Sequence, residues 1–360
     1  MRRRSPEGRL WWYTRVASWP FSIPWSGEKS RDRLGICRYG CGVKPILALA
    51  SSGLIAANIA TLEACDLCAV YNANAAQGEG NAGFHLALAE QFTHSGTLQE
   101  NSREIADPIG QYRDSSITSL IVGYNFTPRW GVTLNVPYIH RSFKRAEGFE
   151  VERGTESGLG DLSLTGRWLV LHKPEHEYSY SLSLLGGVEL PTGDSDRLRE
   201  EVNEVETPGA PPSGVHGNDL ALGSGSFDGI VGVSGSAGWR RLFVNVDAQY
   251  FIRSEGDFDY QFGNELSIAG GPGFYALFEE ARTLALQAAF SYESKARDSV
   301  DGVKRDDGIS SAWYAGPGVT LTWGEHFSVT INADLPIRIT NREFQTVPDY
   351  RIRGGVAWHF

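Results

Sequence analysis

The chain has few cysteines and almost no long apolar runs. Its four cysteines lie at positions 37, 41, 65 and 68, so residues 69–360 cannot contain a disulfide. Only residues 45–62 approach the roughly 18 apolar residues that a membrane-spanning helix needs. These two shortages exclude a disulfide-stapled domain and a bundle of membrane-spanning helices.

Basic charge is also scarce in most of the chain. Residues 1–64 carry 10 Lys or Arg against 4 Asp or Glu, whereas residues 65–360 carry 23 against 39. A protein that binds nucleic acid needs clustered basic charge to displace counterions from phosphate. The acidic main part of the chain therefore predicts no nucleic-acid partner.

Residues that favour strands and turns are abundant. The chain contains 42 Gly, 10 Trp, 14 Tyr and 17 Phe, yet its mean hydropathy is only -0.26. A β-barrel in a membrane needs an apolar side chain only at every second position of each strand. A low mean hydropathy is therefore compatible with a barrel that spans a membrane.

The N-terminal region predicts export. Lys44 precedes the apolar run 45–62, and Glu63-Ala64 follows it, so we interpret residues 43–64 as a signal peptide cleaved after the small Ala64. A membrane anchor is the alternative, but the run is short and contains Ser, Asn and Thr. Residues 1–42 do not resemble a folding unit, and we interpret them as a non-native extension from a mis-assigned start codon.

Two of the cysteines follow this peptide in the sequence Cys65-Asp66-Leu67-Cys68. They could form a short-range disulfide, bind a soft metal, or remain free thiols, and Cys65 could instead carry a lipid. Residues 65–83 are too small and polar to form a core, so we expect a flexible segment that either plugs the barrel or stays in the periplasm. The sequence predicts no cofactor.

Residues 84–360 alternate between apolar and polar side chains. Trp130, Val132, Leu134, Val136 and Tyr138 face one way, for example, and the residues between them face the other. The pattern predicts twelve strands, at 84–93, 115–126, 130–140, 159–171, 177–190, 226–239, 241–253, 262–277, 283–293, 310–323, 326–337 and 348–360.

The intervals between these strands are alternately long and short. The intervals 94–114, 141–158 and 191–225 are long, and each is followed by a short one. Outer-membrane barrels have long external loops and short periplasmic turns. The sequence thus predicts an all-β fold over residues 84–360, a transmembrane antiparallel up-and-down β-barrel of about twelve strands with periplasmic termini. A β-sandwich lacks this rhythm, and a propeller needs a repeated unit that the sequence does not show.

Aromatic residues favour the same interpretation. Trp130, Trp239 and Trp323 flank short turns, and three tyrosines lie near the opposite strand ends at positions 138, 250 and 292. The last strand ends in Trp358 and Phe360, an ending that resembles the signal read by the barrel-assembly machinery. We therefore expect a Gram-negative outer membrane as the location, with its lipid and that machinery as partners.

Three glycine-rich motifs carry a family resemblance. They are Ser157-Gly158-Leu159-Gly160-Asp161, Leu190-Pro191-Thr192-Gly193-Asp194 and Leu222-Gly223-Ser224-Gly225-Ser226. Together they resemble the outer-membrane family named for the MetA pathway of phenol degradation, whose members are barrel transporters for small, often hydrophobic compounds. Physically the motifs are typical of strand ends with turn chemistry. Asp161, Asp194 and Asp228 should lie near one rim, where they could line an entrance or bind a cation.

Charged side chains opposite the apolar stripe should face the barrel interior, because a charge in contact with lipid costs several kcal/mol near the midplane. Pairing of Arg351 and Arg353 with Asp334 would create a transverse field that selects small polar or amphipathic solutes. The alternative is a self-satisfied network that merely fills a narrow barrel. Phe243 and Phe251 would add an apolar strip. The interior candidates are Arg167, Glu189, Asp247, Glu265, Asp334, Arg351, Arg353, Phe243 and Phe251.

These features predict a porin-like channel or transporter for a small-molecule solute, hydrophobic and aromatic compounds included, with passive transport through the barrel. The alternative is a non-conducting structural barrel with an N-terminal redox or metal-binding segment at Cys65 and Cys68. We do not expect an enzyme. The eight histidines have no surroundings that single out a catalytic triad, and no Gly-x-Ser-x-Gly motif follows a strand and opens a helix.

Overall fold

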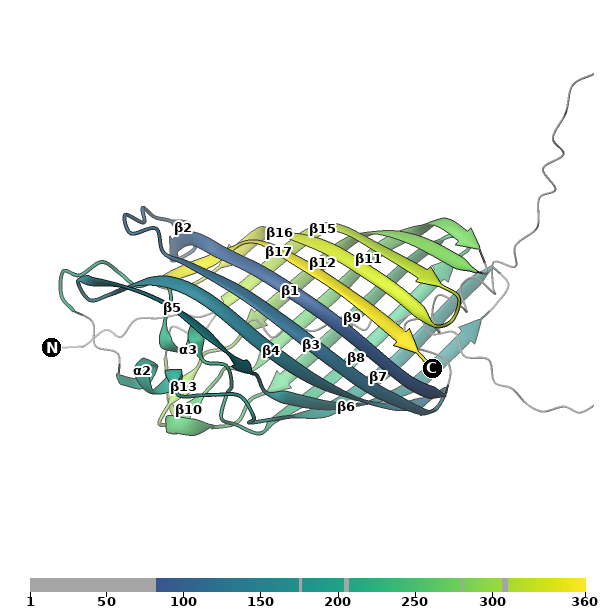
Figure 1. Cartoon of the computed structure of the whole chain (residues 1–360), viewed down its shortest axis with the longest axis horizontal. Helices are drawn as coiled ribbons and strands as arrows, with labels where there is room; N and C mark the ends of the chain where they lie inside the picture. The colour runs from purple at the N-terminus through teal and green to yellow at the C-terminus, as the bar shows by residue number, and fades with distance from the viewer. Residues whose placement is uncertain (1–81, 175–176, 204–206, 280, 306–309) are drawn as a thin grey trace, which may run out of the picture.

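A computed structural model describes residues 82–174, 177–203, 207–279, 281–305 and 310–360 (Figure 1). Several predictions concern residues that the structure does not describe. They are those for the N-terminal extension, the signal peptide, Cys65, Cys68 and the segment 65–83, of which only residues 82 and 83 are described.

Twelve long antiparallel strands form a closed barrel (Figure 1). Each strand pairs with the next along the chain, and the last pairs with the first over Glu100↔Phe344 to His85↔His359. The strands are β1 (Gly83–Glu100), β3 (Tyr112–Thr127), β4 (Trp130–Glu147), β6 (Leu162–Pro174), β7 (Tyr178–Leu190), β8 (Asp228–Trp239), β9 (Leu242–Ile252), β11 (Glu265–Glu279), β12 (Arg282–Lys295), β15 (Ser310–Trp323), β16 (Phe327–Thr340) and β17 (Phe344–His359). The predicted fold class is confirmed.

The alternation in sequence becomes an apolar outer wall and a polar inner wall. On β4, Trp130 is 53% exposed and Tyr138 is 49% exposed, while Ile139 and Arg141, which follow Tyr138, are buried. On β7, Ser181 and Ser183 are buried on the inside. Carboxylates also occur on the outer face: Ser116 and Thr118 donate hydrogen bonds to Glu90 there, and Asp114 lies on the same face beside His94. The outer wall otherwise suits contact with lipid.

The two ends of the barrel differ in the length of their connections. Short turns, such as those at Arg240 and Gly324, occupy the same end as the C-terminus (Figure 1). Both residues adopt the left-handed conformation, with φ of 53°, that tight hairpins require. Phe360 closes this end, since its backbone N–H donates to the carbonyl oxygen of Phe84 over 2.8 Å. We call it the short-turn end, and the other the long-loop end.

The long connections contain more structure than the sequence predicts. Residues 141–158 are not a loop, because β4 continues to Glu147 and β5 (Glu150–Leu159) pairs back on it. Beyond β6, β4 pairs with β3 on one side and with β5 on the other, and β5 lacks the alternation of apolar side chains. β1 likewise continues past the predicted end at residue 93, where it pairs with β2 (Arg103–Glu104).

The remaining elements lie at the long-loop end (Figure 1). They are the helices α2 (Arg197–Asn203) and α3 (Gly217–Leu220), the 3-10 turn η1 (Asp257–Asp259), and a small sheet of β10 (Tyr260–Gln261), β13 (Ser299–Val300) and β14 (Val303–Lys304). Among the described residues, no helix is both long and apolar enough to cross a membrane.

Candidate functional site

The interior of the barrel is lined by charged and polar side chains. The predicted interior residues all lie at inward positions of their strands: Glu189, Asp334 and Arg351 are each 2% exposed, and Phe243, Phe251 and Glu265 are 5–6% exposed. Arg167 points inward too, since it reaches the inward Asn125. Their part in transport stays a prediction.

The inward charges are separated by sign around the barrel. Five adjacent strands, β17, β1, β3, β4 and β6, supply the basic residues, and the strands β7, β8, β9, β11, β12 and β16 supply the acidic ones. Arg253 and Lys295 are basic residues on the acidic side. The basic arc contains His85, Arg113, Arg141, Arg145, Arg167, Arg351 and Arg353, and the acidic arc contains Glu189, Asp228, Asp247, Glu265, Glu293 and Asp334.

Two ion pairs join the arcs where they meet. Arg353 pairs with Asp334 over 2.7 Å, as the sequence predicts. Arg351 instead makes two hydrogen bonds to the carboxylate of Glu293, of 2.8 and 3.0 Å, and lies 4.4 Å from the ring centre of Tyr314. Glu293 was not among the sequence candidates, although its position in phase with buried Ser291 and Ala289 could have identified it.

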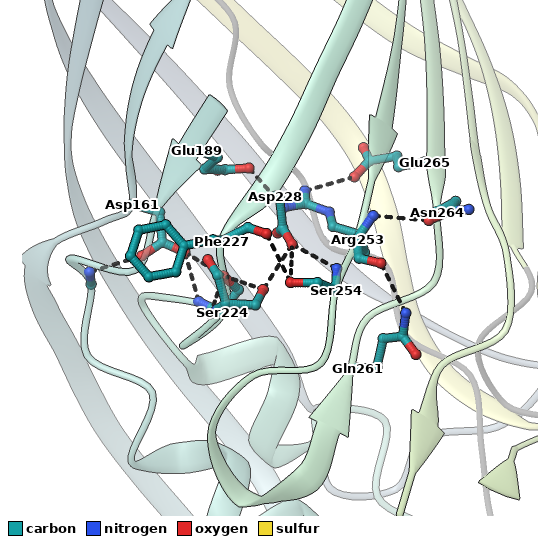
Figure 2. Close-up of polar contacts among 12 residues, drawn as sticks. Asp161, Glu189, Ser224, Phe227, Asp228, Arg253, Ser254, Gln261, Asn264 and Glu265 are labelled. Carbon is teal, nitrogen blue, oxygen red and sulfur yellow. Dashed lines mark hydrogen bonds and ion pairs between the residues drawn. The ribbon is translucent and has the colours of Figure 1, made fainter. Parts of the chain in front are cut away.

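A second cluster of charges lies where the acidic arc meets the long-loop end (Figure 2). Arg253 is buried between Glu189 and Asp228, each 2.7 Å away, and its other nitrogen is 3.6 Å from Glu265. All four side chains are at most 8% exposed. A single guanidinium thus serves three carboxylates, and it is stabilised further by the ring of Phe251 at 4.8 Å.

We expect Arg253→Gln to be strongly destabilising, by about 3–5 kcal/mol, because it leaves buried carboxylates without their counter-charge. The temperature at which the folded barrel converts to the unfolded band in gel electrophoresis should fall. Arg240→Gln is the matched control, since Arg240 makes a 2.9 Å pair with Glu177 on the exposed surface. Equal midpoints for the two variants would contradict this role of Arg253.

The three glycine-rich motifs come together at one carboxylate. One oxygen of Asp161 accepts hydrogen bonds from the backbone N–H groups of Thr192 and Gly193, at 3.0 and 2.8 Å. Its other oxygen accepts from the backbone N–H and the hydroxyl of Ser224, at 2.7 and 2.8 Å. Gly193 and Gly223 pack so closely that a Cβ on either would lie within 2.7 Å of the other's backbone. The motifs therefore hold the two ends of the β7–β8 connection together.

This arrangement bears on the predicted cation site. The carboxylate of Asp161 is occupied by four donors, and that of Asp228 by Arg253, Ser226 and Ser254. Asp194 accepts from the N–H of Asp196. The described residues contain no group of three or more side chains that could hold a metal ion. Asp161 and Asp228 are thus engaged by neighbouring residues of the protein, and a cation site at this rim stays a prediction.

Residues 194–203 and 207–222, which we call the mouth segment, fold into the long-loop end of the barrel (Figure 1). On the basic side, Arg113 of β3 pairs with Asp219 over 2.5 Å, and both side chains are at most 6% exposed. Arg141 of β4 donates to the carbonyl oxygen of Ala221 over 2.6 Å. Leu222 packs against Ile117 and Ile139 of the same two strands.

The mouth segment also reaches the other walls. The hydroxyl of Thr346 on β17 donates to the carbonyl oxygen of Gly214 over 2.9 Å. The amide of Asn218 donates to the hydroxyl of Tyr260, which lies beyond β9, over 2.8 Å. A segment that leaves the barrel between β7 and β8 thus contacts β3, β4, β17 and the β9–β11 connection. It crosses the mouth, and the sequence analysis treated it only as a long loop.

The predicted apolar strip is not continuous. Phe251 lies beneath Arg253 near the mouth, whereas Phe243 packs with Tyr275 and Phe278 near the short-turn end. The inward residues between them include Asn245 and Asp247. The interior therefore offers an aromatic cluster at one end and a mainly polar wall above it.

Comparison with known proteins agrees with this architecture. The chain is similar to the crystal structure of an outer-membrane channel from Pseudomonas putida, with a TM-score of 0.53 and 12% sequence identity over 78% of this chain and 96% of that one. This chain has the fold of an outer-membrane β-barrel. At such low identity the similarity shows the fold alone.

Other similarities are more distant. The β domain of the Bordetella autotransporter BrkA matches with a TM-score of 0.42 and 10% identity, over 78% of this chain and all of that one. The translocator domain of NalP from Neisseria meningitidis matches with a TM-score of 0.38 and 11% identity, over 78% and 90% of the two chains. No protein-family model matches the chain, and no curated protein matches it significantly.

Proposed function

We propose that this protein is an outer-membrane channel that carries small amphipathic solutes, molecules with an apolar body and a charged group, by passive diffusion. The separation of the inward charges into a basic and an acidic arc supports this proposal best. Opposed arcs create a field across the barrel, which orients a solute with separated polar and apolar parts. A barrel filled only for stability has no need to separate its charges by sign.

The character of the wall supports an amphipathic rather than a purely apolar solute. Several inward hydroxyl groups and one amide oxygen are buried without a hydrogen-bond partner among the described residues, namely those of Thr93, Ser95, Ser119, Ser234, Ser291 and Asn332. Such groups need polar contents in the interior to satisfy them. The aromatic cluster of Phe243, Tyr275 and Phe278 provides apolar contact for an aromatic ring. Aromatic acids combine both requirements and agree with the family resemblance of the motifs.

The experiment is solute uptake into liposomes that contain the purified full-length protein. Benzoate, glucose and toluene represent an amphipathic, a neutral polar and an apolar solute of small size. We expect benzoate to enter faster than glucose relative to protein-free liposomes. Protein-dependent entry of toluene alone would overturn the amphipathic assignment, and the absence of any protein-dependent flux would overturn the channel.

The contacts of the mouth segment favour one second candidate, a non-conducting structural barrel. The segment contacts walls on several sides of the mouth, and such a barrel would remain closed. This candidate predicts no flux even after the contacts of the mouth segment are broken. The same liposome assay, applied to a variant with a released mouth segment, separates the two functions.

A further inference from the structure

Two basic side chains lie on the inner wall near the short-turn end, on strands β1 and β6, which β3 and β4 separate. His85 of β1 lies opposite Gly123 of β3, and Arg167 of β6 lies opposite Gly131 of β4. Asn125 of β3 is also opposite Gly131. Gly123 and Asn125 are two residues apart on β3, so the row of paired residues through His85 and the row through Arg167 are adjacent on the inner wall. The four strands belong to the basic arc.

The glycines make room for the polar groups beside them. A Cβ on Gly123 would lie 1.9 Å from Nε2 of His85, so the imidazole lies directly over that backbone. A Cβ on Gly131 would lie 2.2 Å from Oδ1 of Asn125. Any larger residue at either position would displace the imidazole or the amide. The wall is therefore shaped to hold these two side chains flat against it.

Neither basic side chain has its hydrogen-bonding capacity filled by the described residues. Nη2 of Arg167 donates to Oδ1 of Asn125 over 3.3 Å, but its Nη1 is buried without a partner. Nε2 of His85 is 3.4 Å from the hydroxyl of Thr133, and its Nδ1 is buried without a partner. Within the part of the chain that the structure describes, no carboxylate forms an ion pair with either of them.

This pair differs from the other basic residues of the same arc. Arg113, Arg351 and Arg353 each pair with a carboxylate at 2.5–2.8 Å. Arg167 is half-buried, but its Nη1 is buried without a counter-charge, which is unfavourable. The planar fork of guanidinium N–H groups matches the two oxygens of a carboxylate. No described residue supplies a counter-charge to Arg167, and the carboxylate of a ligand would supply one.

We propose that His85 and Arg167 form a binding site for the carboxylate group of a small organic acid. Arg167 supplies the charge and an N–H group, and His85 supplies a second nitrogen from the adjacent row of inward residues. The ligand is an aromatic or short aliphatic monocarboxylate. The role of the site in transport rests on the proposed channel function, whereas binding itself does not. The site lies near the short-turn end, so it is where a solute that enters from the long-loop end would be held last.

Isothermal titration calorimetry of the full-length protein in detergent tests the site, with benzoate, acetate and inorganic phosphate as probes. Loss of a hydrogen bond to a charged group costs about tenfold or more in affinity. We expect Arg167→Gln and Gly123→Val each to weaken benzoate binding by at least that factor, and Arg167→Lys to weaken it less. Arg240→Gln, at an exposed turn of the same end, should bind benzoate as the native protein does.

The outcomes separate the site from the channel. Folding of each variant is checked by the heat-dependent shift in gel mobility, and Arg167→Lys retains the charge if Arg167→Gln does not fold. Equal benzoate affinity of the native protein and the folded Arg167 variants would overturn the site, and so would tighter binding of phosphate than of benzoate. Benzoate binding without liposome flux would overturn the channel but not the binding site. Liposome flux without benzoate binding would overturn the binding site but not the channel.

Discussion

Asp219→Asn should increase solute flux through the reconstituted barrel by one to three orders of magnitude. Among the residues that the structure describes, Asp219 is the carboxylate that pairs with Arg113, and the two buried groups are 2.5 Å apart. Breaking a buried ion pair from one side costs about 3–5 kcal/mol. If the mouth segment has an open and a closed position, loss of this ion pair destabilises the closed position by that free energy. The ratio of open to closed molecules then rises by the factor that corresponds to it. Benzoate uptake into liposomes measures the change.

Arg113→Gln should have the same effect, because it removes the other half of the pair. Glu177→Gln is the control, since Glu177 also loses an ion pair with an arginine but lies at the exposed short-turn end. Unchanged flux in both variants of the buried pair, with the barrel still folded, would show that the mouth segment does not limit passage. In that case the narrow part of the barrel lies elsewhere.

Removal of Phe360 should abolish most of the folded protein in the outer membrane while export continues. Phe360 is 70% exposed, yet its N–H bonds to Phe84, the residue at the start of the strand that closes the barrel. Trp358, two residues earlier, is also on the outer wall. The ending therefore combines a contact that completes closure with a side chain that the assembly machinery can reach. Gel mobility of unheated outer-membrane fractions measures the folded yield.

Phe227→Ala provides a closely matched control. Phe227 is also 70% exposed, but it lies at the long-loop end, directly before β8. Loss of an exposed phenylalanine there should leave the yield almost unchanged. Equal folded yields for the truncated protein and for Phe227→Ala would show that the terminal aromatic has no special part in assembly.

The strands could be predicted from the sequence because their signal is local. Alternation with a period of two needs only a few neighbouring residues, and it is strong wherever one wall faces lipid and the other faces the interior. It weakens where the wall no longer meets lipid, as at β5, so the hairpin beyond the barrel was taken for a loop. The inward position of Asp334 and Arg353 followed from the same alternation.

Contacts between distant segments could not be predicted in this way. The three motifs were identified one by one as strand ends, but nothing local indicates that Asp161 accepts from both Gly193 and Ser224. The pairing of Arg351 with Glu293 depends on two strands that are not neighbours in the barrel. His85 was overlooked because a lone histidine in a strand has no pattern, and its importance depends on Gly123 opposite.

Asp161 holds both roots of the mouth segment at a single point. The hydrogen bonds from Thr192 and Gly193 fix its start, and those from Ser224 fix its end. The hydrogen bonds at the two ends of the segment therefore offset the entropic cost of closing the loop. That cost grows only slowly with the number of residues between the ends. The residues between these two fixed ends can therefore vary in number and sequence. Insertions or replacements between residues 195 and 221 should alter what the mouth admits without disturbing the barrel that carries it.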